Sequence, residues 1–174
     1  MSRLAAGLGS LIFLLVAPGT VAGIIPWWIS QWRPKPSVFD VRWLAYVGAA
    51  LVVCGLLALL ESFARFALQG LGTPAPVLPT RHLVVTGLYR YVRNPMYVAV
   101  VMLILGQALM LADGRLLAYA ALVWGCFHAF VLWYEEPTLR RAFGSEYQDY
   151  CANVRRWLPR LRPWTISTGA RDRP

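Results

Sequence analysis

The sequence has few charged residues for its length. Asp, Glu, Lys and Arg make up 14% of the 174 residues, and only eight of these residues are acidic. Soluble domains carry about 25% charged residues, so the composition excludes an ordinary soluble domain. Hydrophobic residues reach 58% and include eight Trp, a composition typical of membrane proteins with aromatic residues at their interfaces. At this length we expect one membrane domain spanning residues 1–174.

The residues that usually build metal sites and disulfide frameworks are also scarce. Cys54, Cys126 and Cys151 show no paired spacing with each other or with a histidine, and free thiols are expected. His82 is predicted to lie in a loop, and His128 is predicted to be a buried, hydrogen-bonded residue of a helix. No metal is therefore expected.

Several soluble-enzyme motifs are missing. The sequence has no Walker motif and no soluble-type Rossmann fingerprint, and no nucleophile–base arrangement is evident. The net charge of +9 could suggest nucleic acid. However, the excess arginine is concentrated in loops and in the C-terminal tail, as the positive-inside rule predicts for membrane proteins, and no nucleic-acid partner is expected.

Four apolar runs are long enough, or nearly so, to cross a bilayer. They cover residues 4–29, 43–63, 95–111 and 115–134. The first run exceeds the apolar core of about 7–15 residues in a signal peptide, so we interpret it as a span, with a kink expected at Pro18-Gly19. The predicted fold class is an all-α integral membrane protein with about four transmembrane helices plus a C-terminal amphipathic helical segment.

The polar connections predict the topology. The loop 69–94 is rich in Gly and Pro and cannot be one helix. The tail 138–158 repeats apolar residues every three or four positions, which predicts an amphipathic helix, broken at Gly144 and ended by Pro159. One side of the membrane receives twelve arginines, and the other receives three arginines and one lysine. This bias places the N-terminus, the 69–94 loop and the tail in the cytoplasm.

Two polar clusters flank the last pair of predicted spans. The clusters cover residues 83–97 and 134–137. Since these two spans form an antiparallel hairpin, Asn94 and Glu135 should lie on the same membrane face. Outside these clusters, Glu61 and Arg65 lie four residues apart on one predicted helix, and we interpret them as an interfacial ion pair.

Glu135 and Glu136 are expected at the C-terminal end of the fourth span. The helix dipole disfavours negative charge there, so a positive group such as Arg90 or Arg93 should be nearby. Two interpretations stay open for the glutamates, ordinary interfacial charge or a functional pair. The arginines likewise either extend to the interface or hold an anionic group.

The clusters carry a family resemblance. The stretches LVVTGLYRYVRNPMY at 83–97, YEEP at 134–137 and FGSEYQDY at 143–150, in this order, resemble the membrane-embedded methyltransferases that include isoprenylcysteine carboxyl methyltransferase and phosphatidylethanolamine N-methyltransferase. The resemblance covers about 80–158. It implies S-adenosylmethionine as methyl donor, S-adenosylhomocysteine as product, and a lipophilic acceptor at the interface. It also suggests a bacterial inner-membrane protein.

The resemblance implies a cofactor site and roles within it. Glu135 and Glu136 would accept hydrogen bonds from the cofactor's ammonium or hydroxyl groups, and Arg93 or the backbone amides near Gly87 would hold its carboxylate. If the acceptor must lose a proton, Glu135, Glu136 and Tyr97 are the candidates for removing it. The full set of implied cofactor-binding residues is His82, Leu83, Val84, Gly87, Tyr89, Arg93, Asn94, Tyr97, Glu135 and Glu136.

The sequence departs from the family pattern at two positions. Asn94 stands where many members have a histidine, and it cannot act as a base. Asn153 stands where carboxyl methyltransferases of this type have a basic residue, which weakens the case for a prenylcysteine carboxylate as acceptor. Two alternatives to an enzyme remain, a non-enzymatic membrane subunit and a small transporter. For a transporter, Gln107 and His128 are nearly the only polar residues inside the spans. The oligomeric state is left open.

Overall fold

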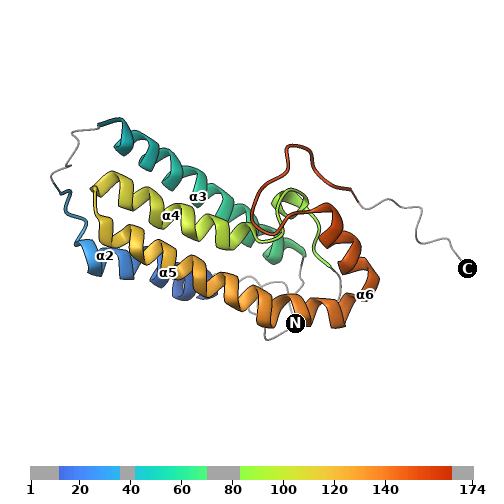
Figure 1. The fold of residues 1–174 in the computed structure, drawn as a ribbon. Helices are drawn as coiled ribbons and strands as arrows, with labels where there is room; N and C mark the ends of the chain where they lie inside the picture. Colours follow the sequence, from blue (N-terminus) through green and yellow to red (C-terminus); the bar gives the residue numbers. More distant parts are fainter. Residues whose placement is uncertain (1–11, 36–41, 70–82, 166–174) are drawn as a thin grey trace, which may run out of the picture.

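The computed structural model describes residues 12–35, 42–69 and 83–165, and all regular secondary structure within these ranges is helical. The prediction of an all-helical protein is confirmed. The N-terminal helical segment lies beside α5 (Gly114–Phe130), as Figure 1 shows, and it also contacts α4 (Pro95–Leu111). Within the described ranges, three helices are long and apolar enough to cross a membrane: Ile12–Ser30, Trp43–Arg65 and Gly114–Asn153. One further apolar helix there, Pro95–Leu111, is shorter.

The first helical segment changes its winding in the middle. Residues 12–19 are α-helical, a π-helical turn follows over Thr20–Ile24, and α2 completes the segment over Ile25–Ser30. The irregularity therefore begins directly after Pro18-Gly19, where a kink was predicted. The part of the predicted first span before residue 12 lies outside the described residues.

Neighbouring helices hydrogen-bond to the backbone of the π-helical turn. Tyr119 Oη donates to the carbonyl of Val21 at 2.9 Å, and Gln107 Nε2 donates to the carbonyl of Ala22 at 2.8 Å. Irregular backbone inside a membrane helix is tolerated when such partners are present. Gln107 is thus occupied by structural hydrogen bonds.

The helices α3 (Arg42–Gln69) and α4 (Pro95–Leu111) pack closely through glycines. A Cβ placed on Gly48 would lie 2.6 Å from the carbonyl oxygen of Gly106, and a Cβ on Gly106 would lie 2.6 Å from that of Gly48. Small residues let membrane helices approach at backbone distance. This contact fixes α3 against α4, whose first residue is Pro95, the helix position that suits proline best.

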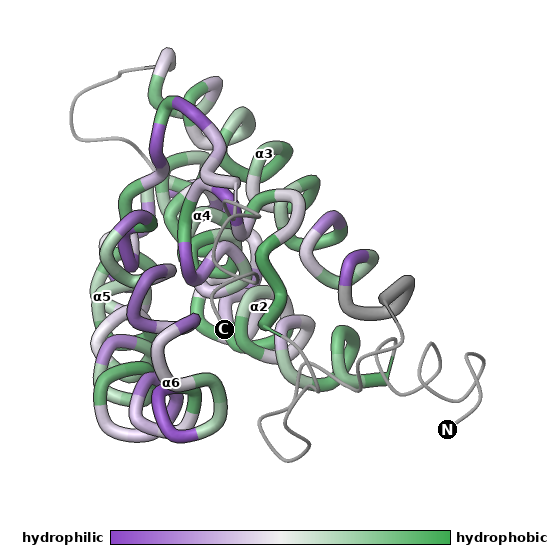
Figure 2. The backbone as a smooth tube through the Cα atoms, turned by 90° about the vertical axis from the view of Figure 1, so that its right-hand side faces the viewer, coloured by the Kyte–Doolittle hydropathy of each residue, from purple (hydrophilic) through white to green (hydrophobic). Residues whose placement is uncertain are grey.

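The core lies between these helices, and the outer surface is apolar. Leu59, Ala99 and Ile104 are among the buried core residues, whereas Tyr46 and Trp133 are 77% and 82% exposed. Figure 2 shows hydrophobic residues along the outer helices and hydrophilic ones gathered towards the tail. Such a surface suits a lipid environment.

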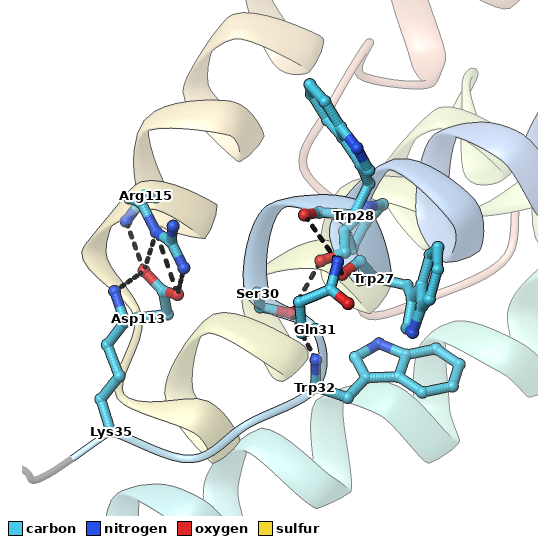
Figure 3. A network of polar contacts seen from close by, with 9 residues as sticks. Trp27, Trp28, Ser30, Gln31, Trp32, Lys35, Asp113 and Arg115 are labelled. Carbon is cyan, nitrogen blue, oxygen red and sulfur yellow. Dashed lines mark hydrogen bonds and ion pairs between the residues drawn. The ribbon is translucent and has the colours of Figure 1, made fainter.

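The turn between α4 and α5 (Gly114–Phe130) is fixed by a buried carboxylate, as Figure 3 shows. Asp113 accepts from Lys35 Nζ at 3.0 Å and from Arg115 Nη2 at 2.7 Å, and its side chain also caps α5 by accepting from the Arg115 backbone amide. The guanidinium of Arg115 contributes most to holding the pKa of Asp113 well below its usual range, with Lys35 adding to the effect against the opposing cost of burial.

A helical path continues through the glutamate pair. After α5 comes a π-helical turn, Val131–Glu135, and then α6, Glu136–Asn153. The expectation that the glutamates end a helix is therefore wrong, and so is the dipole argument built on it. Pro137 lacks the amide that would bond the Trp133 carbonyl, and the π-helical turn, with a bond from Thr138 Oγ1 to the Tyr134 carbonyl at 2.7 Å, lets the chain continue.

The tail departs from its predicted helix at the far end. Gly144, at φ +52° and ψ −123°, interrupts α6 where a break was predicted. The helix ends at Asn153 rather than at Pro159, because Val154 is extended, fully buried and packed with Tyr147 and Tyr150. Beyond α6 the chain turns back across the bundle end, opposite the α4–α5 turn (Figure 1).

Candidate functional site

The two polar clusters meet at Tyr97 and Glu135. Tyr97 Oη on α4 donates to Glu135 Oε2 in the π-helical turn at 2.9 Å. The Tyr97 ring also packs against Phe127 of α5, with centroids 4.6 Å apart. A phenol and a carboxylate 38 residues apart are thereby held in one place, on the membrane face predicted for Asn94 and Glu135.

Glu136 has a different environment from its neighbour. It is buried, and it forms a two-bond contact with Arg156, whose Nε and Nη2 donate at 2.6 and 3.0 Å. Arg93 Nη1 lies 3.3 Å away and Arg140 Nη2 lies 3.9 Å away. Three cations therefore surround this carboxylate, which supplies the positive charge expected near the pair.

Arg93 connects this ion cluster to the tail. Its backbone amide donates to the Arg155 carbonyl at 3.0 Å, and its Nη1 contacts both Glu136 and Cys151 Sγ. Its Nε is buried and has no hydrogen-bond partner among the described residues. A buried donor without a partner is costly, so this atom is suited to an anionic group of a ligand.

The chain after α6 forms a strap over the segment 89–94, and we call residues 154–164 the tail strap. It is joined to that segment by main-chain bonds from Arg160 to Tyr91 and from Trp164 to Arg90, and by a bond from Asn94 Nδ2 to the Arg156 carbonyl at 3.1 Å. At the other side Trp157 Nε1 donates to His128 Nδ1 at 3.1 Å. His128 is hydrogen-bonded as predicted, but it is half-buried rather than buried.

Tyr89, in the first polar cluster, is held by a residue of α6. Its carbonyl accepts from Tyr150 Oη at 2.6 Å. Burial, followed by the nearby Glu135 carboxylate, holds the pKa of the Tyr89 phenol well above its usual range. Tyr89 is therefore a neutral phenol at physiological pH.

The other predicted site residues have varied positions. Val84 is buried, Leu83 packs against the cluster around Tyr147 and Tyr150, and Gly87 opens the 3₁₀ turn Gly87–Arg90 with φ +54°. His82 lies outside the described residues.

Sequence reasoning missed two contributors in the tail. Arg156 binds Glu136, and Tyr150 holds the backbone of Tyr89. Tyr150 stands in the FGSEYQDY stretch and in the apolar repeat of the predicted tail helix, but it was given no role at the site. The extended residue Val154, which turns Arg156 inward, has no signal in the helical pattern.

A family model for phospholipid methyltransferases matches residues 43–146, more than half of the chain. The chain belongs to the phospholipid methyltransferase family. This family consists of S-adenosylmethionine-dependent methyltransferases. The match includes the Tyr97–Glu135 pair and Arg93, whereas the tail strap lies beyond it. The resemblance inferred from the motifs is confirmed at the level of the family.

Curated relatives of this family member are distant. The chain is 28% identical over 131 residues to a probable protein-S-isoprenylcysteine O-methyltransferase of Oryza sativa subsp. indica, and equally to that of subsp. japonica. The alignment covers 71% of this chain and 65% of each relative. The chain thus spans slightly less than two thirds of the length of these plant proteins.

Proposed function

We propose that this protein transfers a methyl group from S-adenosylmethionine to a lipophilic acceptor at the membrane interface. The observation that carries the proposal is the convergence of Tyr97, Glu135 and Arg93 at one end of the bundle, in a chain of the methyltransferase family. A hydroxyl, a carboxylate and a buried guanidinium together match the ammonium, hydroxyl and carboxylate groups of the cofactor.

The chain's residues divide the binding work. Glu135 accepts from the ammonium or the ribose hydroxyls, and Arg93 donates to the carboxylate through its otherwise unpartnered Nε. The backbone groups of Leu83 and Val84 serve the adenine, and Tyr89 and Tyr97 line the position of the sulfonium. Glu136, which also pairs with Arg140 and Arg156, holds Arg93 in place.

Catalysis by these residues consists of alignment and exclusion of water. The bound cofactor supplies a methyl group already activated by the sulfonium. Where the acceptor must lose a proton, Glu135 is the candidate base, with Tyr97 holding its carboxylate. An acceptor approaching from the bilayer suits a protein whose outer helical faces are apolar.

The proposal includes a topology. Four spans, comprising the first helical segment, α3, α4 and the α5 portion of the longest helix, give a multi-pass protein of a bacterial inner membrane. The arginine bias puts the glutamate pair, the tail strap and both termini in the cytoplasm. The cofactor is then available from the cytoplasm, while the acceptor enters from the membrane.

The test is calorimetric binding of S-adenosylhomocysteine to detergent-purified protein. We expect saturable micromolar binding by the wild type. Glu135→Gln should weaken it at least about tenfold without lowering the melting temperature greatly, because a charge-assisted hydrogen bond contributes about 1.5–3 kcal/mol. Glu136→Gln should mainly destabilise the fold, by roughly 3 kcal/mol, because three arginines lose their shared partner.

Tyr97→Phe tests the other partner of the Tyr97–Glu135 hydrogen bond, because it keeps the ring against Phe127 and removes only the hydroxyl. A folded wild-type protein that binds no S-adenosylhomocysteine would overturn the proposal. Variants that change stability but never binding would instead favour a non-enzymatic membrane subunit.

A further inference from the structure

Glu61 of α3 lies against Gly87, one of the predicted cofactor-binding residues. Its Oε1 accepts from Arg65 Nε at 2.7 Å, which confirms the predicted ion pair. The pair lies directly on the backbone of Gly87. A Cβ added to Gly87 would be 2.1 Å from Glu61 Oε1 and 2.8 Å from Arg65 Nε. The φ of +54° favours glycine at this position, and any side chain here would also displace the Glu61–Arg65 pair. The pair is therefore packed against another segment of the chain, rather than standing free on the surface of α3.

The second carboxylate oxygen of Glu61 has no hydrogen-bond partner in the part of the chain that the structure describes. Although 31% of the side chain is exposed, Oε2 itself is buried and receives no hydrogen bond among the described residues. Burying a charged acceptor without a donor is costly. Among the described residues, one other buried side-chain nitrogen or oxygen lacks a hydrogen-bond partner, and it is the donor Arg93 Nε. The unmatched acceptor thus belongs to a residue beside the start of the 3₁₀ turn, and the unmatched donor belongs to Arg93, shortly after the turn's end.

Tyr89, two residues after Gly87, has a phenol that is influenced by both Glu61 and Glu135. Burial is the main cause of the raised pKa of its phenol, and the carboxylates of Glu135 and, more weakly, Glu61 add to it. Both carboxylates therefore act electrostatically on the same hydroxyl. Glu61 comes from α3 and Glu135 from the turn before α6, so the two acidic groups approach Tyr89 from different helices.

We propose that Glu61 is a further binding residue of the methyl-donor site, and that its Oε2 accepts a hydrogen bond from the ammonium of the donor's amino-acid end. This inference rests on the proposed function. An ammonium suits a buried, charged acceptor better than a neutral hydroxyl does, because a charge-assisted bond is stronger and neutralises the carboxylate. Arg93 then takes the carboxylate of the same amino-acid end. The sulfonium is no alternative, because it has no hydrogen to donate.

The experiment compares two probes on folded, detergent-purified full-length protein. S-adenosylhomocysteine carries the amino-acid end, and 5′-methylthioadenosine has the same adenine and ribose without it. Glu61→Gln keeps the acceptor for Arg65 but removes the charge. We expect it to weaken S-adenosylhomocysteine about tenfold or more and to leave methylthioadenosine unchanged.

Arg65→Gln is the matched control. It breaks the same ion pair but leaves the Glu61 carboxylate uncompensated, so binding of S-adenosylhomocysteine should hold or improve. If Glu61 only stabilises α3, both variants will lower the melting temperature alike and neither will change affinity, which overturns the inference. Equal weakening of both probes by Glu61→Gln also overturns it, because the contact would then be to the nucleoside.

Two further results keep the test decisive. Should Glu61→Gln fail to fold, Glu61→Asp keeps the charge and withdraws the oxygen by one methylene, and the same selective loss is expected. Wild-type binding is measured first. Its absence would overturn the proposed function and this inference together, whereas normal wild-type binding with an unaffected Glu61→Gln would overturn only the inference.

Discussion

Two adjacent glutamates of this protein have distinct surroundings. Glu135 receives one neutral hydrogen bond, from the phenol of Tyr97, whereas Glu136 is surrounded by the guanidinium groups of three arginines. Because Glu136 is already fully matched by charge, it is better suited to positioning Arg93 than to binding a ligand. Glu135 keeps the capacity to accept from a cationic ligand group.

Asp113 gives a residue-scale prediction at the opposite end of the bundle. Its depressed pKa means that the folded state prefers the ionised form. The resulting stabilisation is present above the unfolded-state pKa of about 3.9, and it is lost as the pH falls towards the folded-state pKa. We expect Asp113→Asn to lower the melting temperature clearly at pH 7 and progressively less below about pH 4.

Thermal unfolding in detergent from pH 7 to pH 3 measures this effect, and the difference between wild type and variant removes the contribution of other titrating groups. The variant keeps a side chain that can cap α5, so cap loss does not dominate. A difference that stays constant with pH would show that the Asp113 charge contributes nothing to stability.

At the scale of helices, the glycine contact between α3 and α4 positions the site. α4 carries Tyr97, and α3 carries Glu61, so the relative placement of these two helices sets the distance between their side chains. The contact depends on backbone atoms of Gly48 and Gly106, which lie too close for any side chain on either residue.

Gly106→Ala should therefore destabilise the protein by about 1–3 kcal/mol, as overpacking does in other closely packed interiors. Gly125→Ala on α5 is the control, because a Cβ there meets no atom within 4 Å, and alanine favours a helix by up to about 1 kcal/mol over glycine. Melting temperatures in detergent compare the two. Equal melting temperatures of the Gly106→Ala and Gly125→Ala variants would contradict the close contact between Gly48 and Gly106.

At the scale of the whole molecule, the two polar ends of the bundle are chemically different. One end holds the Lys35–Asp113–Arg115 network beside the exposed tryptophans Trp28 and Trp32 (Figure 3). The other holds the glutamate pair and the tail strap. Arginine bias predicts that the second end faces the cytoplasm.

A labelling experiment tests this orientation. In a background with alanine at the three native cysteines, Arg33→Cys and Arg162→Cys each introduce a single thiol at an exposed position, one at each end. An impermeant maleimide should label the first variant in intact cells and the second only after permeabilisation. The reverse pattern would invert the orientation, and labelling of both from one side would contradict the membrane crossing between them.

Local signals predicted much of the fold. Long apolar runs indicated helices without any tertiary information, and the prolines at 18 and 95 marked an irregular turn and a helix start. The continuation through Glu136 was missed, because a π-helical turn and the hydroxyl of Thr138 compensate for Pro137. The true end of α6 was missed because burial of Val154, a tertiary effect, overrides the helical pattern.

By itself the sequence determined that the chain is apolar and helical, that two polar clusters flank one hairpin, and that their motifs belong to a methyltransferase family. These features depend on composition and on the order of residues along the chain. Only the tertiary structure decided which glutamate meets Tyr97 and which meets the arginines, and that Glu61 lies on Gly87. Those partnerships join residues from different helices, and their geometry is fixed by packing rather than by spacing in the sequence.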